Sequence, residues 1–310
     1  MTAPARDRRA GDDADPCNTE FTNTFVTPVV YVLCVVRSAE SNTTMCGIAG
    51  FSLSSESPVD RTLAAQALLA GIAERGADAV GYAHRGADGS VGVTKLRGGA
   101  SALLDELDVP KATNEALIHV RDYTKGHPEI QANNHPIRHG SVVGIHNGVI
   151  ENDDALLAHY GIERAEPQMT VDSEAIFALM EHRRHDARAL SEMRGAMAAA
   201  WLDERDDATL YLARGRLRPL WVGRTGDGLY FASTRRALTI AAAALQARLD
   251  VREVREGRLL RIVDGRVVRE RRFRPDRHYR ENGYKPPVRA PREAVSCLER
   301  LAALTSVSPA

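Results

Sequence analysis

Cys46 is the residue whose surroundings most favour chemistry. It follows Met45 directly and precedes Gly47. If the mature chain begins after that methionine, Cys46 is its first residue and carries a free α-amine. Such an amine has a pKa of about 8, so a useful fraction is neutral at physiological pH and can accept the thiol proton as a general base. The sequence therefore predicts a cysteine nucleophile activated by its own amine; the alternative is a small buried residue that opens a strand.

Asn147 and Gly148 have the residue types of an oxyanion hole. Attack on a carboxamide places negative charge on its oxygen, which fixed donors must meet at about 3 Å. The side-chain amide of Asn147 and the backbone N–H of Gly148 are the candidate donors. The same dipeptide is also typical of a type I′ hairpin turn, and a tight turn held by a strand over 141–145 would aim the N–H as well.

Three further residues suit the head group of an amino-acid substrate. The planar guanidinium of Arg121 matches an α-carboxylate, and Thr124 offers a hydroxyl to the same group. Asp172 suits an α-ammonium, although an aspartate before a helix is also a common N-cap. His135 and His146 have no third ligand spaced with them, so we assign them no catalytic role and expect no metal and no cofactor.

The segment from Met45 to Phe51 resembles the opening of the class II glutamine amidotransferases, the family with an N-terminal cysteine nucleophile. The resemblance covers roughly residues 45 to 270 and is closest to the glutaminase domain of glucosamine-6-phosphate synthase. Each motif alone is weak, but five in the family order are strong. The further motifs are R-G-A-D-A-V-G (75–81), H-V-R-D-Y-T-K-G (119–126), N-N-H-P (133–136), H-N-G-V-I-E-N (146–152) and T-V-D-S-E (170–174).

This resemblance implies an α+β fold, the four-layer αββα sandwich of the N-terminal nucleophile hydrolases. It also implies hydrolysis of L-glutamine through a γ-glutamyl thioester on Cys46, and scaffolding roles for His135 and His146. In two positions the chain departs from the family, which usually has tryptophan and histidine where Asp122 and Lys125 stand. Because that tryptophan helps to gate ammonia in synthase relatives, the departure bears on ammonia coupling rather than on hydrolysis.

Three functions are compatible with these motifs. The leading one is a glutaminase that supplies ammonia to a separately encoded synthase subunit, because residues 275–310 leave no room for a synthase domain. The second is a stand-alone amidohydrolase acting on another γ-glutamyl amide. The third is a catalytically silent binding or regulatory module, which is favoured if Cys46 never becomes an N-terminus.

The amino-acid composition excludes several classes of partner and site but does not itself indicate a function. Lys plus Arg and Asp plus Glu both number 41 in the 310 residues, so net charge points to neither nucleic-acid nor membrane partners. Four scattered cysteines form neither zinc spacing nor a disulfide framework. We therefore expect a cytoplasmic protein with reduced cysteines.

The chain divides into three parts by composition. Residues 1–44 are interpreted as a disordered leader that is removed or is a mis-annotated extension before a true start at Met45. The apolar run over 25–36 makes a signal peptide the alternative, but acidic residues interrupt the region before it. Residues 45–273 form the predicted glutaminase domain, and 274–310 a loosely ordered tail.

The elements that must position these residues follow from hydrophobic periodicity. No G-x-G-x-x-G follows a predicted strand, so a doubly wound nucleotide-binding fold is not favoured. A hairpin is predicted over 257–273, with its turn at Asp264 and Gly265. Strands are predicted over 47–53, 91–96, 117–121, 142–146, 196–202, 209–213, 220–222 and 229–232, and helices over 60–75, 153–160, 172–182 and 235–247.

Overall fold

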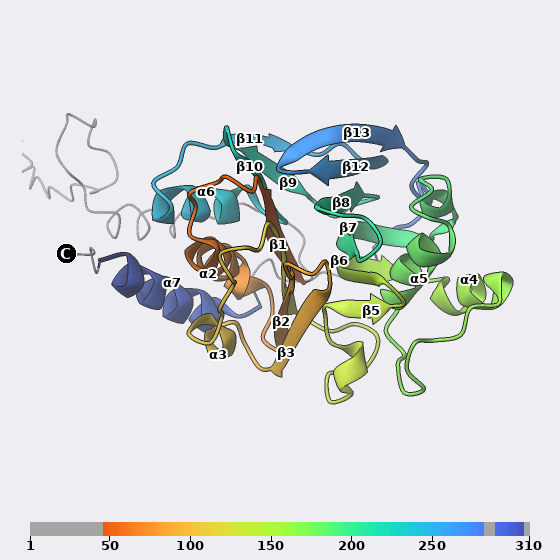
Figure 1. Ribbon diagram of the computed structural model, residues 1–310. Helices are drawn as coiled ribbons and strands as arrows, with labels where there is room; N and C mark the ends of the chain where they lie inside the picture. The colour runs from red at the N-terminus through yellow and green to blue at the C-terminus, as the bar shows by residue number, and fades with distance from the viewer. Residues whose placement is uncertain (1–45, 282–288, 307–310) are drawn as a thin grey trace, which may run out of the picture.

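A computed structural model describes residues 46–281 and 289–306. Two antiparallel sheets pack face to face, and helices cover both outer faces, with α2, α6 and α7 beside one sheet and α4 and α5 beside the other (Figure 1). The structure is therefore an α+β sandwich of four layers, as the family resemblance implied. The predicted leader over 1–44 lies outside the described residues.

Sheet A has seven strands, and the predicted nucleophile Cys46 immediately precedes its central strand. Its central strand β1 pairs with β4 on one side and β10 on the other. In spatial order the strands are β11 (Asp250–Glu253), β9 (Trp221–Arg224), β10 (Gly228–Ala232), β1 (Gly47–Leu53), β4 (Glu115–Arg121), β2 (Ala79–Arg85) and β3 (Val91–Arg97).

Sheet B has six strands and carries the predicted oxyanion residues on β6. In spatial order the strands are β13 (Arg266–Arg272), β12 (Arg258–Val263), β8 (Thr209–Arg214), β7 (Gly195–Asp203), β6 (Val142–Ile150) and β5 (Ile137–His139). The β12–β13 hairpin turns at Asp264 and Gly265, both with positive φ, which confirms the prediction.

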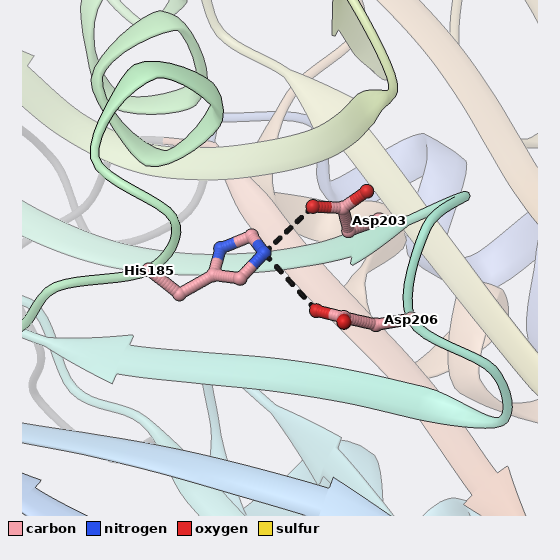
Figure 2. A group of neighbouring side chains, drawn as sticks. All are labelled: His185, Asp203 and Asp206. Carbon is pink, nitrogen blue, oxygen red and sulfur yellow. Dashed lines mark hydrogen bonds and ion pairs between the residues drawn. The ribbon is translucent and has the colours of Figure 1, made fainter.

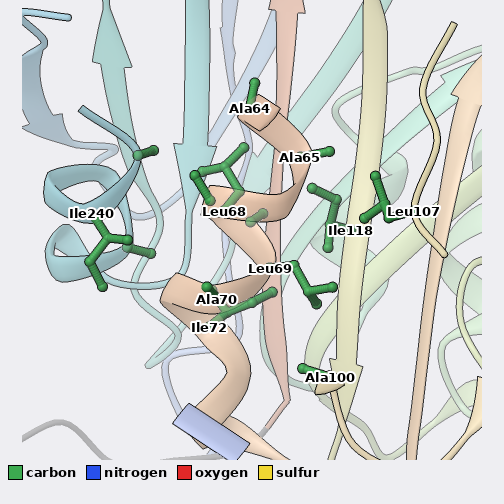
Figure 3. Close-up of a cluster of buried hydrophobic side chains, with 14 of the residues drawn as sticks. Ala64, Ala65, Leu68, Leu69, Ala70, Ile72, Ala100, Leu107, Ile118 and Ile240 are labelled. Carbon is green, nitrogen blue, oxygen red and sulfur yellow. The ribbon is translucent and has the colours of Figure 1, made fainter. Parts of the chain in front are cut away.

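Buried apolar side chains fill three layers of core. One cluster lies between the sheets and includes Ile48 of β1 and Ile145 of β6. A second lies under the helices of sheet A, where Leu68 and Leu69 of α2 pack near Ile118 of β4 (Figure 3). The third lies between sheet B and α5.

The helices are α2 (Arg61–Ile72), α3 (Ser101–Leu104), α4 (Asp153–Tyr160), α5 (Glu174–His182), α6 (Arg235–Ala244) and α7 (Pro291–Ser306), with short 3₁₀ turns η1 (Ala73–Arg75), η2 (Gln131–Asn133) and η3 (Ala189–Glu192).

The tail differs from its prediction as a loosely ordered segment over 274–310. Residues Pro291–Ser306 form α7, which buries Cys297, Leu298 and Leu301 in the core under sheet A. These positions recur at helical spacing, so burial of one apolar face stabilises the helix. In the part of the chain that the structure describes, no helix combines the length and apolar character needed to cross a membrane.

Candidate active site

The candidate site lies where β1 begins, beside the end of β4. Cys46 immediately precedes β1, its side chain is 7% exposed, and its thiol donates a hydrogen bond to the Asp122 carbonyl at 3.3 Å. Behind it, the buried Arg75 donates from Nε to the Cys46 carbonyl at 3.2 Å. Both bonds fix the backbone and side chain of Cys46 at the edge of sheet A.

Burial raises the pKa of the Cys46 thiol to about 11, while Arg121 lowers it and Asp172 raises it. The thiol is therefore protonated near neutral pH, and a nucleophilic role requires a base beside it. In the full chain the nitrogen of Cys46 is part of a peptide bond with Met45. A peptide nitrogen is not basic, so only a freed α-amine at this position could serve.

Arg121 ends β4 and is almost fully buried. Its guanidinium donates to the side-chain oxygen of Asn134 and to the carbonyls of Lys125 and Gly126. A guanidinium has five N–H donors, so two remain for a ligand. Arg121 thus organises the loop over 122–126 and still presents cationic donors toward the site.

Asp172 is buried and does not cap the following helix. Its carboxylate accepts a hydrogen bond from the backbone N–H of Ile150 at 2.7 Å, and the helix-capping position falls on Ser173, which makes no capping bond through its side chain. Burial raises the pKa of the Asp172 carboxyl to about 6. The capping alternative is wrong, and a buried carboxylate faces the cavity beside Cys46.

Asn147 and Gly148 do not form a hairpin turn. Both lie inside β6, paired with Ala198 and Met197 of β7, and the pairing continues to Ile150. Gly148 has φ +149°, and a Cβ there would lie 1.9 Å from the Ala196 carbonyl oxygen. Glycine is required at position 148 because its φ is positive and because the Ala196 carbonyl oxygen leaves no room for a side chain, and not because the chain turns there.

The two predicted oxyanion residues face different surroundings. Gly148 lines the cavity that also contains Cys46. Asn147 does not line that cavity; it is fully buried on the face of β6 that packs between the sheets, as Ile145 does. Neither polar atom of its amide has a hydrogen-bond partner within the described residues. A buried amide without partners costs about 1–3 kcal/mol, which a ligand or water could offset.

The loop over 122–126 closes the site and is anchored by ion pairs. Lys125 Nζ lies 2.6 Å from the Asp153 carboxylate and 3.0 Å from Asp154, and Arg164 binds both aspartates. Arg164 also pairs with Glu174 at the start of α5. Lys125, a departure from the family, therefore ties the loop to α4 and to the segment that carries Asp172.

The cavity enclosed by these elements is small. Its volume is about 10 Å³, on the order of one water molecule. This space is smaller than an amino acid. The lining residues are Cys46, Arg121, Asp122, Tyr123, Thr124, Lys125, His135, His146, Gly148, Val171, Asp172 and Ser173.

The histidines behind the cavity are buried and neutral. Burial lowers the pKa of both His119 and His146 to about 3, and that of His135 well below its usual value. His119 donates to the His146 carbonyl at 3.1 Å and stacks on His135, while His146 contacts the Ser173 hydroxyl at 2.9 Å. These contacts fit the predicted scaffolding role.

Three residues that were not predicted as catalytic or substrate-binding residues position those that were. Arg75 anchors Cys46, and Asn134 orients Arg121. Asp78 accepts from the Tyr123 N–H at 2.9 Å and its own N–H donates to the Arg121 carbonyl. Arg75, Asp78 and Asn134 all lie within the recognised motifs, so the motifs signalled their importance without indicating their contacts.

Several known proteins are similar to this chain in sequence or fold. Residues 124–240 match the family model described as a glutamine amidotransferase domain. A glutamine–fructose-6-phosphate aminotransferase (isomerizing) from Oceanobacillus iheyensis is 28% identical over 74% of this chain and 39% of its own length. The corresponding protein from Acidithiobacillus ferridurans is 34% identical over 63% of this chain and 32% of its own length.

A solved structure supports the architecture. The glutamine phosphoribosylpyrophosphate amidotransferase from B. subtilis, complexed with ADP and GMP, aligns with a TM-score of 0.58 and 22% identity. The alignment covers 73% of this chain and 49% of that one. The family-model match, the similar aminotransferases and the shared fold together support a class II glutamine amidotransferase domain in this chain. The chain spans less than half the length of these relatives.

Proposed function

We propose that this protein is a glutaminase that hydrolyses L-glutamine to glutamate and ammonia. The Cys46 sulfur attacks the side-chain carboxamide carbon, ammonia leaves, and water then hydrolyses the γ-glutamyl thioester. The observation that carries the proposal is that Cys46, Arg121, Asp172 and Gly148 line one cavity, although they come from four separate segments of the chain.

The head group of glutamine defines the binding roles. The two remaining N–H donors of Arg121 would bind the α-carboxylate, and the exposed Thr124 hydroxyl would reach it from the loop. The Asp172 carboxylate accepts from Ile150 through Oδ2, and its other oxygen, Oδ1, would receive the α-ammonium. The Gly148 N–H would meet the oxyanion, and the unpartnered amide of Asn147 would have to turn out of the space between the sheets to join it.

Proton transfer requires a free amine at Cys46. With the thiol pKa raised by burial, a neighbouring α-amine of pKa about 8 would take the proton on attack and return it to departing ammonia. The active form would therefore begin at Cys46, by initiation at Met45 and methionine removal or by cleavage before Cys46. A chain blocked at this nitrogen would be silent.

We further propose that the ammonia is used by a separately encoded synthase subunit in the cytoplasm. The support is that the similar curated proteins are named as glutamine–fructose-6-phosphate aminotransferases, in which the nitrogen of glutamine is passed to an acceptor. The alternative function is hydrolysis of another γ-glutamyl amide, which would use the same head-group pocket with a different leaving group.

The decisive experiment is intact mass and N-terminal sequencing of natively expressed protein, combined with ammonia release from glutamine. We expect a chain that begins at Cys46 and releases ammonia. A panel of γ-glutamyl amides separates the alternatives, because a higher kcat/KM for one of them than for glutamine would favour the independent amidohydrolase. A homogeneous chain starting at Cys46 that turns over neither class of substrate would refute the proposal.

The pH profile should report Asp172. Above a pH of about 6 its carboxyl is ionised and can pair with the α-ammonium, whereas below this pH it is neutral and attraction is lost. We expect log kcat/KM to rise with slope one between about pH 6 and 8, where the α-amine deprotonates, and with slope two below about pH 6. In Asp172→Asn the lower break should vanish, leaving slope one; an unchanged break in that variant would assign it to another group.

A further inference from the structure

A second cavity lies on the outer face of sheet B, beside the end of α5. Its volume is about 200 Å³, twenty times that of the cavity at Cys46. It lies near Asp203, where β7 ends, whereas Gly148 lies toward the opposite end of the β6–β7 pair. The lining residues are Arg184, His185, Asp206, Tyr211, Leu259, Arg261, Arg269 and Arg271.

Four arginines dominate this cavity. Arg261 pairs in register with Arg269 across the β12–β13 hairpin, and Leu259 pairs with Arg271, so all three arginines share the outer face with Leu259. Arg184 enters from the turn after α5. No ion pair is found for any of the four among residues 46–281 and 289–306.

Like charges directly opposite each other on a sheet are unfavourable unless something compensates them. The carboxylates near the cavity are already engaged. Asp206 accepts from the Tyr211 hydroxyl at 2.7 Å and lies 3.3 Å from His185 Nε2. Asp203 binds Arg205 through both carboxylate oxygens. The cavity therefore keeps an excess of positive charge.

The adjacent cluster of His185, Asp203 and Asp206 has ligand atoms close enough for a cation (Figure 2). The hydrogen bonds argue against one. Trp201 Nε1 is a donor only and lies 3.1 Å from His185 Nδ1, so Nδ1 accepts. The proton of the neutral imidazole is then on Nε2, which donates to Asp203 at 2.7 Å. No ring nitrogen has a lone pair left for a metal.

This cluster instead supports the cavity wall. The His185 ring stacks on Tyr211 with centroids 4.2 Å apart, and Tyr211 stacks on Trp201. Arg184 and His185 both have positive φ, and the bonds from His185 to Asp203 and Trp201 hold this strained corner in place. The backbone of Arg184, which also lines the cavity, is thereby held at this corner.

We propose that this cavity is a binding site for a small phosphorylated anion. Guanidinium groups match phosphate oxygens with two parallel hydrogen bonds, and arginines from two strands and one turn would surround such a ligand. The volume lies below the range of about 300–1,000 Å³ usual for drug-sized ligands, so a diphosphate or a compact phosphomonoester fits the space better than a nucleotide. The site is separate from the glutamine cavity and does not depend on the proposed glutaminase activity.

The test is calorimetric titration of the full chain with inorganic pyrophosphate, orthophosphate and sodium chloride at matched ionic strength. We expect pyrophosphate to bind most tightly and orthophosphate more weakly, with no saturable binding of chloride. The variant Arg269→Gln/Arg271→Gln should weaken pyrophosphate binding at least tenfold, and Arg184→Gln, on a different element, should weaken it as well.

Arg235→Gln is the matched control, because this exposed arginine opens α6 on the opposite outer layer. It should bind pyrophosphate like the unmodified protein. Thermal unfolding in chloride alone checks that each variant is folded. Equal binding by Arg235→Gln and by the cavity variants, or the absence of saturable pyrophosphate binding by the unmodified chain, would overturn the proposal.

Discussion

Replacing Cys46 by alanine is expected to lower the kcat for ammonia release by at least about 10³-fold, because Cys46 carries the one thiol among the described residues that line the cavity. The thiol makes one weak hydrogen bond to the Asp122 carbonyl, so the loss of unfolding free energy should be about 1 kcal/mol. Cys46→Ser should be similarly inactive, since an alcohol is far less acidic than a thiol.

The intermediate gives an independent measurement of the same prediction. Acid-quenched protein incubated with glutamine should gain the mass of one γ-glutamyl group, located on Cys46 by peptide mapping. The control is Cys297→Ala, which removes a fully buried thiol in α7, far along the chain from the site. That variant should be less stable but should retain kcat. Adduct formation in Cys46→Ala, or loss of the adduct in Cys297→Ala at a temperature where it is folded, would contradict the assignment.

Strong local patterns predicted most of the secondary structure that positions the site. The strand at Gly47–Leu53 and the helix at Asp153–Tyr160 begin and end where the sequence placed them. The β12–β13 hairpin was recognisable from Asp264 and Gly265, because both adopt the positive φ that such a turn requires. In these segments, local preference and tertiary packing agree.

The errors arose where tertiary contacts overrode local signals. Asn147 and Gly148 are typical of a turn, yet continuous pairing with β7 keeps them in a strand. The strand Ala79–Arg85 was missed because its first residues belong to the motif over 75–81, which was not assigned to a strand; Gly81 allows close approach to the His135 carbonyl. The apolar spacing of Cys297, Leu298 and Leu301 would have predicted α7, but the arginine-rich segment before it obscured the pattern.

The site was only partly predictable for a related reason. Residue types identified Cys46, Arg121 and Asp172 as candidates, and they line the same cavity. Their supporting contacts depend on how distant strands and loops align, which spacing does not encode. Asn133 is an example of such a supporting contact. Its side-chain oxygen accepts hydrogen bonds from the backbone N–H groups of Thr170 and Val171, and thereby joins two motifs 37 residues apart.

Replacing Arg121 by alanine is expected to lower kcat/KM for glutamine by about 10²–10³-fold. A hydrogen bond to a charged group contributes about 1.5–3 kcal/mol, and the α-carboxylate would lose its cationic partner. In addition, the bonds to Asn134 and to the Lys125 and Gly126 carbonyls would be lost, so the loop over 122–126 would be less well held. KM should therefore rise most, with a smaller fall in kcat because the adjoining Asp122 carbonyl holds the Cys46 thiol.

A substrate comparison separates carboxylate binding from this structural role. Glutaminamide lacks the α-carboxylate, so the unmodified enzyme should discriminate strongly against it, whereas Arg121→Ala should use glutamine and glutaminamide almost equally. Arg97→Ala removes an exposed arginine of β3 whose ion pair with Glu129 spans 3.6 Å and should leave both substrates unaffected. If Arg121→Ala loses activity but still prefers glutamine by the original factor, Arg121 acts only by holding the loop, and the α-carboxylate must be bound by another group.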